Sequence, residues 1–203
     1  MDLVPTIFST GWAAGVNSYA TVALLGILGR LGVGEVPEPL TQDAVIAFAL
    51  VMYAIEFVTD KIPYVDTSWD VVHTAIRPAI ASLIGVSFAD ADHVNQIDTM
   101  LAGGGSGVTA LASHGVKASL RLGINTSPEP VTNIIASVTE DLLAAGVVVL
   151  ALEHPEAAAS IAAALLIAGL GLVILVWSRI RRAWRRWKAW RETRKAGRDP
   201  PGG

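Results

Sequence analysis

The chain has 203 residues, of which 52% are hydrophobic and only 16% are charged. The hydrophobic residues occur in long blocks, which predicts helices that are apolar on all sides and argues against a soluble globular domain. There is no cysteine, so disulfides, thiolate metal sites and cysteine nucleophiles are excluded. No basic region precedes the first long apolar segment, so we expect no removable signal peptide.

The net charge of −3 hides an uneven distribution along the chain. Ten of the fifteen Lys and Arg residues lie between Arg179 and Arg198, whereas residues 1–178 carry five basic and sixteen acidic side chains. We therefore predict a membrane domain over residues 1–178 and a separate basic tail over residues 179–203.

Six apolar segments approach the roughly 20 residues that a membrane-spanning helix needs. They cover residues 8–33, 43–60, 71–89, 99–123, 131–152 and 157–178. The third is interrupted by Arg77 and Pro78, and the fourth is diluted by three consecutive glycines and several charges, so these two are the weakest. The predicted fold class is an all-α polytopic membrane protein with about six spans.

Two parts of the chain resemble each other at a constant offset of 91–92 residues. The matching positions are Gly11, Gly15, Arg30 and Pro37 to Pro39 in the first part, and Gly103, Gly107, Arg121 and Pro128 to Pro130 in the second. Each repeat, about 8–89 and about 99–178, holds three segments, so the second is expected to enter the membrane from the opposite side as an inverted repeat. The paired glycines predict a close approach of the first and fourth segments.

The basic tail has its tryptophans on one side of a helical projection and most of its Lys and Arg residues on the other. These tryptophans are Trp177, Trp184, Trp187 and Trp190. We expect an amphipathic helix at the membrane surface, with the arginines against anionic lipid, and no nucleic-acid binding. The positive-inside rule places the tail in the cytoplasm, and six spans would place the N-terminus there too.

Polar and charged residues lie in or beside the second to fifth segments, where a charge at the bilayer centre costs about 2.5–3.5 kcal/mol. Many recur at helical spacing, which predicts polar faces that turn toward one another around a cavity. The candidate ion-pathway residues are Glu56, Asp60, Lys61, Asp66, Asp70, His73, Arg77, His114, Lys117, Arg121, Asn125, Ser127, Glu129, Asn133, Ser137, Glu140 and Asp141. The alternative is that these charges only pair with one another and hold the bundle together.

The sequence motifs DKIPYVD, HGVKA and NTSPEP, with the Trp-Asp, Arg-Pro and Glu-Asp pairs around them, resemble the integral-membrane proteins catalogued as domain-of-unknown-function family 4126. The resemblance covers nearly all of residues 8–175 and leaves the basic tail outside. It implies a small polytopic protein of the bacterial inner membrane, with no activity to carry over.

The first functional hypothesis is a transporter or channel for a small ion or solute. The excess of acidic residues favours a cation, either a proton or a divalent metal ion held by Asp66, Asp70 and His73. The runner-up ligand is an anion held by Lys117, Arg121 and the free amides near Asn125 to Ser127.

Two other classes of function remain open from the sequence. One is a non-transporting scaffold that makes contacts through its tail. The other is an enzyme acting on lipid headgroups through Asp66, Asp70, His73 and His114, although no established catalytic motif is present. A homodimer is expected, because six short helices leave little room to enclose a pathway.

Overall fold

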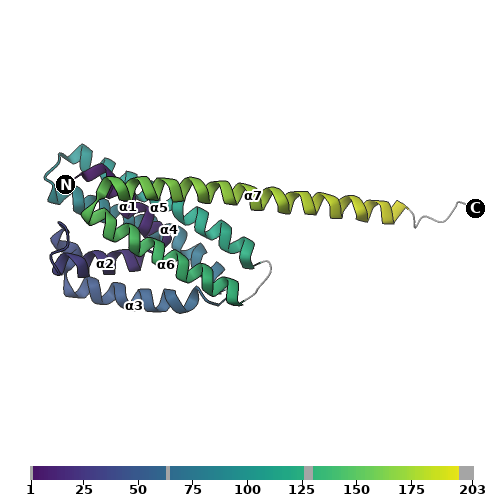
Figure 1. Ribbon diagram of the computed structural model, residues 1–203, viewed down its shortest axis with the longest axis horizontal. Coiled ribbons are helices and arrows are strands. Elements are labelled where there is room, and N and C mark those ends of the chain that lie inside the picture. The colour runs from purple at the N-terminus through teal and green to yellow at the C-terminus, as the bar shows by residue number, and fades with distance from the viewer. Residues whose placement is uncertain (1, 63–64, 126–129, 197–203) are drawn as a thin grey trace, which may run out of the picture.

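The computed structural model describes residues 2–62, 65–125 and 130–196, and within these ranges every regular element is a helix (Figure 1). The elements are α1 (Leu3–Val16), α2 (Ser18–Arg30), the 3-10 helix η1 (Glu38–Thr41), α3 (Asp43–Thr59), α4 (Val65–Ala91), α5 (Gln96–Asn125), α6 (Pro130–Glu153) and α7 (Pro155–Ala196). The predicted all-α fold is confirmed for this part of the chain. The two weakest predicted spans are uninterrupted helices, since α4 continues through Pro78 and α5 through its three glycines.

The first predicted span is a helical hairpin rather than one helix, so this prediction is wrong. Asn17 has extended backbone angles, φ −150° and ψ 100°, and its side-chain oxygen accepts the backbone N–H of Ala20 at 2.9 Å. This residue therefore ends α1 and caps the N-terminus of α2. Both ends of the hairpin lie at one end of the bundle, because Asp2 lines a groove with His154 and Gly34 packs against Leu152.

The hairpin changes how the chain passes through the bundle. Each helix from α3 to α7 runs along the bundle axis, in alternating directions, whereas α1 and α2 together return to their starting end (Figure 1). The start of α1 and the end of α7 consequently lie at opposite ends of the molecule, whereas six full spans would bring them to the same end. The six-span inverted repeat is not confirmed, since its first unit contains a hairpin that the second unit lacks.

Helix α1 lies at the centre of the bundle and packs against α2, α4, α5, α6 and α7. Gly11 packs against Ser106 of α5, and Gly15 against Ala110 and Ser113 of the same helix, so the expected close approach is confirmed on this side. The matching glycines of α5, however, face α4 rather than α1. The apolar core around α1 includes Trp12, Val16, Leu25, Ile84, Phe88 and Val148.

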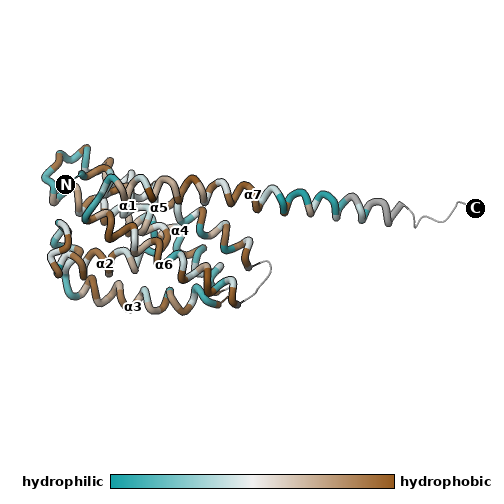
Figure 2. Tube along the Cα trace, viewed as in Figure 1, coloured by the Kyte–Doolittle hydropathy of each residue, from teal (hydrophilic) through white to brown (hydrophobic). Residues whose placement is uncertain are grey.

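The molecule exposes apolar side chains and buries charged ones, which is the reverse of a soluble protein. Val71, Val108 and Leu142 are each more than 65% exposed, whereas Arg77 and Arg121 are 0% exposed. The surfaces of α3, α6 and the first part of α7 are largely hydrophobic (Figure 2). Three helices of the described chain, α4, α6 and α7, are long and apolar enough to cross a membrane. These helices indicate a membrane protein.

The basic tail continues α7 without a break (Figure 1). Helix α7 has 42 residues, which corresponds to about 63 Å, and its polar second half projects beyond the other helices (Figure 2). The four tryptophans are 36–65% exposed, and the Arg191 guanidinium lies 4.1 Å from the Trp187 ring. The predicted helix is confirmed up to Ala196 and continues the last span, whereas its position at the membrane surface stays a prediction.

Candidate functional site

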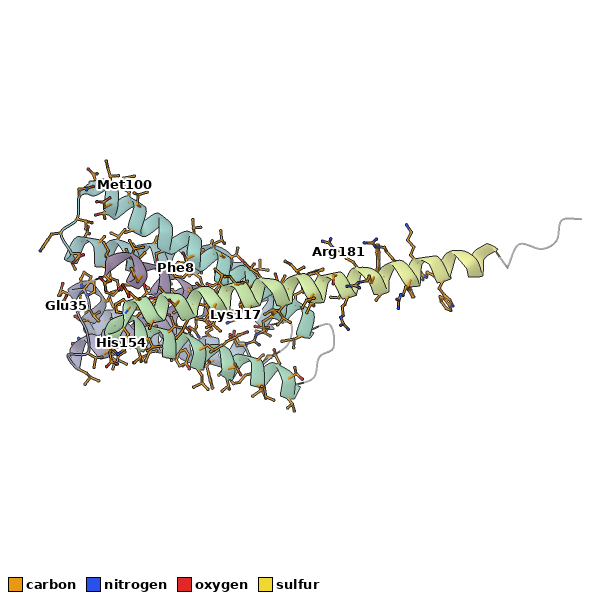
Figure 3. The ribbon with its side chains drawn as sticks, turned by 45° about the horizontal axis from the view of Figure 1, so that its top comes forward. Phe8, Glu35, Met100, Lys117, His154 and Arg181 are labelled. Atoms are coloured by element: carbon orange, nitrogen blue, oxygen red, sulfur yellow. The ribbon has the colours of Figure 1, made fainter. Side chains whose placement is uncertain are left out.

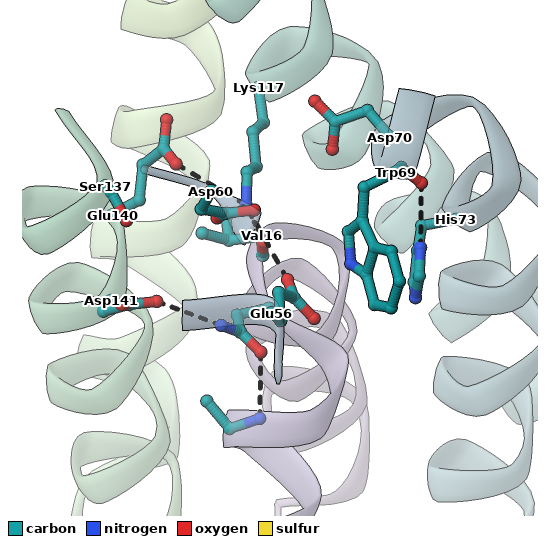
Figure 4. A network of polar contacts seen from close by, with 12 residues as sticks. Val16, Glu56, Asp60, Trp69, Asp70, His73, Lys117, Ser137, Glu140 and Asp141 are labelled. Atoms are coloured by element: carbon teal, nitrogen blue, oxygen red, sulfur yellow. Dashed lines mark hydrogen bonds and ion pairs between the residues drawn. The ribbon is translucent and has the colours of Figure 1, made fainter. Parts of the chain in front are cut away.

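The α1–α2 hairpin fills only part of the length of the bundle. Helix α1 spans about 21 Å from its 14 residues, whereas α5 spans about 45 Å from its 30 residues. Polar side chains from α3 to α6 occupy the space beyond the hairpin tip (Figures 3 and 4). We call them the charged cluster: Glu56, Asp60, Asp66, Asp70, His73, Arg77, His114, Lys117, Arg121, Asn133, Ser137, Glu140 and Asp141. All except Glu140 and Asp141 are buried.

Arg77 joins α4 to the C-terminus of α1 and to the end of α3. Its guanidinium donates hydrogen bonds to Glu56 Oε1 at 2.8 Å and to the backbone oxygen of Gly15 at 3.0 Å. A weaker ionic contact reaches Asp70 at 3.4 Å. Because the last carbonyls of a helix carry partial negative charge, Arg77 stabilises the end of α1 as well as the buried carboxylate.

Lys117 makes the equivalent connection from α5. Its ammonium donates to the backbone oxygen of Val16 at 3.1 Å and to Asp60 Oδ2 at 2.9 Å (Figure 4). Longer ionic contacts reach Glu56 at 3.8 Å and Glu140 at 3.6 Å. Two cations, from α4 and α5, therefore hold the last two carbonyls of α1.

Arg121 joins α5 to α6 nearer the tail end of the bundle. It binds Glu140 through Nε and Nη2, with a shortest distance of 2.8 Å, and donates to Asn133 Oδ1 at 2.6 Å. It also donates to the backbone oxygen of Asp60, which accepts a second bond from the Asn133 amide at 3.1 Å. The contact of the Arg121 guanidinium with the Glu140 carboxylate, through two nitrogens, is the strongest type of ion pair in proteins.

Helix α2, the second helix of the hairpin, has the acidic residue Asp141 near its N-terminus. Asn17 donates from its amide to Asp141 Oδ1 at 3.0 Å, which ties the hairpin tip to α6 (Figure 4). The acidic side chain lies where the α2 dipole is positive, and the cations lie where the α1 dipole is negative. At the edge of the cluster, Lys61 donates to Ser137 at 3.4 Å and lies over the Phe57 ring.

Both histidines of the cluster have protein partners at each ring nitrogen. His114 Nδ1 faces the Arg77 N–H at 2.8 Å and so accepts, which leaves Nε2–H to donate to the backbone oxygen of Asp70 at 3.0 Å. His73 Nδ1–H donates to the Trp69 carbonyl at 2.8 Å, and its Nε2 lies 3.1 Å from the Tyr19 hydroxyl. Neither ring has a free nitrogen for a metal ion. The described residues bring together no group of three His, Asp or Glu side chains suited to a metal, so the divalent site at Asp66, Asp70 and His73 gains no support.

The charges of the cluster do not balance. Within the described part of the chain, four buried carboxylates meet three buried cations, and two half-buried carboxylates lie beside Lys61 at the edge. The carboxylates are Glu56, Asp60, Asp66, Asp70, Glu140 and Asp141. The three closest ion pairs are Arg77 with Glu56, Lys117 with Asp60 and Arg121 with Glu140. Neither side-chain oxygen of Asp70 accepts a hydrogen bond from the described residues.

Two small grooves reach the cluster from the outside. One, of about 250 Å³, lies against α7 and touches Lys117 and Glu140 among mostly apolar side chains. The other, of about 210 Å³, lies between α4 and α5 and touches Asp70. Among the described residues the cluster is thus a buried polar interior that these grooves reach from outside, whereas the sequence predicts a polar cavity.

The structure brings together most of the residues predicted from sequence. The faces of α4, α5 and α6 do converge as expected, with the end of α3 beside them (Figure 4). Ser127 and Glu129 lie outside the described residues, as does the side chain of Asn125, so the predicted anion site there stays a prediction. Sequence reasoning missed Asn17 and the carbonyls of Gly15 and Val16; the Asn-Ser pair inside an apolar run is a helix N-cap signal that could have revealed them.

The hairpin and the charged cluster together lie within a single region of sequence similarity. Residues 4–177 match the family described as domain of unknown function (DUF4126). The chain belongs to this family. The match ends at Trp177, so the family covers the bundle but not the basic second half of α7. No curated protein and no solved structure matches the chain.

Proposed function

We propose that this protein moves a small cation, an alkali metal ion or a proton, across the membrane through the charged cluster. The observation that carries the proposal is the excess of carboxylates over cations in a buried region. A buried carboxylate without a compensating charge is too costly to remain ionised, so it must bind a proton or a cation. Groups that exchange such a partner are the elements from which ion pathways are built.

In this proposal the α1–α2 hairpin closes one end of the ion pathway, and its tip forms the gate. Discontinuous helices in transporters place their termini at the ion site, near the middle of the membrane. Here the tip at Asn17 meets the cluster, while the hairpin itself packs into the apolar core at the other end. The cluster would exchange ions with the tail end, and passage to the opposite end would require the tip to move.

A cation fits the contacts better than an anion does. The buried basic groups are already held by carboxylates and by the carbonyls of Gly15 and Val16. An anion would have to displace those partners, whereas a cation or proton would relieve the excess negative charge.

The first prediction is selective flux in reconstituted liposomes. We expect the purified protein to carry K⁺, Na⁺ or protons down a gradient faster than empty liposomes do, because these ions complement the cluster. Chloride, sulfate and phosphate should show no increase under the same conditions. Anion flux without cation flux would reverse the proposed sign of the substrate, and no flux of either kind would mean that the proposal is wrong.

A scaffold is the second candidate, and the extensive pairing of Arg77, Lys117 and Arg121 favours it. In that case the charges only hold the helices together. Removing the tail would then abolish function, whereas conservative changes in the cluster would lower stability alone.

We further propose that the tail end of the bundle faces the bacterial cytoplasm and that the tail binds anionic lipid there. Its excess of Lys and Arg at the end of a span fits the positive-inside rule. Val173, Ile174 and Trp177 lead into a basic face formed by Arg181, Arg182, Arg185 and Arg186. This change from apolar to cationic side chains corresponds to the boundary between acyl chains and headgroups.

The second prediction concerns this basic face. Changing its four arginines to Gln should lower the thermal stabilisation that the protein gains from phosphatidylglycerol over phosphatidylcholine in nanodiscs, since each basic residue near an anionic surface contributes about 1 kcal/mol. The matched control changes the same four residues to Lys, which keeps the charge and should retain most of the effect. Equal stabilisation in the Gln and Lys variants would contradict a role in lipid binding.

A further inference from the structure

Asp70 differs from the other carboxylates of the charged cluster in its surroundings. It is 4% exposed, yet neither of its carboxylate oxygens accepts a hydrogen bond from the described residues. Its nearest cationic contact is Arg77, at 3.4 Å from Oδ1, and that guanidinium is hydrogen-bonded instead to Glu56. Asp70 is therefore a buried carboxylate whose charge the protein does not fully compensate.

The groove that Asp70 lines has the chemistry of a cation site. It has a volume of about 210 Å³ between α4 and α5, and three hydroxyl-bearing residues, Thr67, Thr74 and Ser119, line it with the carboxylate. Carboxylate and hydroxyl oxygens are hard ligands, suited to hard cations and not to soft metals. The apolar rim, Val71 and Leu122, is exposed, so the groove opens on the surface of the bundle.

The groove also lies near the end of the bundle from which the tail projects. Asp70 is five residues from the start of α4, about 7.5 Å along the helix from the tail end of the bundle. Leu122 lies three residues before the end of α5, at the same end. A hydrated ion arriving from that side meets the groove before it meets the tip of the hairpin.

We propose that this groove is a binding site for an alkali metal cation, held by the Asp70 carboxylate with Thr67, Thr74 and Ser119 around it. This inference rests on the proposed function and names its substrate class. The four buried carboxylates of the charged cluster face three buried cations, so one surplus negative charge matches a single positive charge. The described residues offer no third acidic or histidine ligand that a divalent ion would favour. The bound ion compensates Asp70 and, by leaving, returns the cluster to its negative state.

The test is binding of Na⁺, K⁺ and Li⁺ to the purified full-length protein in nanodiscs of uncharged lipid. Calorimetry and thermal unfolding are measured at constant pH and ionic strength, with choline chloride replacing the alkali salt. We expect saturable heat and a rise in melting temperature with at least one alkali cation and not with choline, since a ligand of the folded state stabilises it. Asp70→Asn should abolish both signals, and Ser119→Ala should weaken binding severalfold while leaving the carboxylate in place.

The matched control is Asp92→Asn, which alters an exposed carboxylate between α4 and α5 and should bind as the wild type does. An alkali response that is absent in the wild type, or unchanged in both Asp70→Asn and Ser119→Ala, would overturn the site. Proton flux in liposomes without alkali binding would overturn the site and leave the proposed function standing. Alkali binding without flux would support the site and overturn the proposed function, so the two failures are distinguishable.

Discussion

Replacing Arg77 with Met should lower the free energy of unfolding by about 3–5 kcal/mol, the range measured when one partner of a buried ion pair is removed. Glu56 would lose its 2.8 Å partner, and the Gly15 carbonyl at the end of α1 would lose its donor. Because Arg77 is 0% exposed, water cannot replace these contacts without opening the bundle. Denaturant titration of the purified protein in detergent micelles measures the change.

Two further variants separate the ion pair from a general effect of losing an arginine. Arg30→Met removes an exposed pair with Asp43 and should cost less than about 1 kcal/mol. Adding Glu56→Gln to Arg77→Met removes the orphaned carboxylate and should recover part of the lost stability. A double variant as unstable as the sum of its two single variants would show that the two side chains do not interact as the geometry indicates.

Gly15→Val should be the second most damaging substitution, because it attacks the contact between the hairpin and α5. A Cβ atom at Gly15 would overlap Ser113 Oγ and the backbone of Ala110, so α1 would have to move away. Movement of α1 would also pull the Gly15 carbonyl from Arg77. We expect a loss of about 3 kcal/mol, at the upper end for overpacking, measured by the same titration.

Gly104→Val provides the matched control for this substitution. Gly104 lies in a helix as Gly15 does, but a Cβ there has no neighbour within 4 Å. The free energy of unfolding of the Gly104→Val variant should therefore stay within about 0.5 kcal/mol of the wild-type value. Equal losses in the two variants would mean that the cost comes from the helix itself and not from the α1–α5 contact.

Five of the six segments predicted from the hydropathy pattern correspond to α3 to α7, to within a few residues at most ends, since continuous apolar blocks leave little choice in a membrane. It predicted the convergence of α4, α5 and α6 for a related reason. Asp70, His73 and Arg77 recur at helical spacing, as do His114, Lys117 and Arg121, and a charged face in lipid must turn inward.

The hairpin could not be predicted from the apolar pattern, because a break at one residue leaves the hydropathy of the segment unchanged. Asn17 interrupts α1 and α2 through backbone angles and a local cap, and a sliding average over about 20 residues does not register either. The sequence similarity between the two halves was also misleading in the region of the hairpin. Arg30 is exposed at the end of α2, whereas its counterpart Arg121 is buried inside α5, so similar sequence occupies different environments.

The sequence also could not predict which carboxylates are paired with a cation and which are not. Asp60 at the end of α3 and Asp70 in α4 are both buried acidic residues of the charged cluster, but Asp60 lies 2.9 Å from Lys117 and Asp70 accepts no hydrogen bond from the described residues. Which carboxylate is compensated depends on side-chain positions at the ends of two helices. Composition alone could show only that acids outnumber bases in the bundle.

The most direct test of the central claim, that the charged cluster conducts cations, is the rate of cation flux per folded molecule in Asp70→Asn liposomes. We expect at least about a tenfold decrease from the wild-type rate, since a lost contact to a charged group of about 1.5–3 kcal/mol corresponds to that factor or more. The Asp92→Asn variant should retain the wild-type rate. Wild-type flux in folded Asp70→Asn protein would contradict the claim.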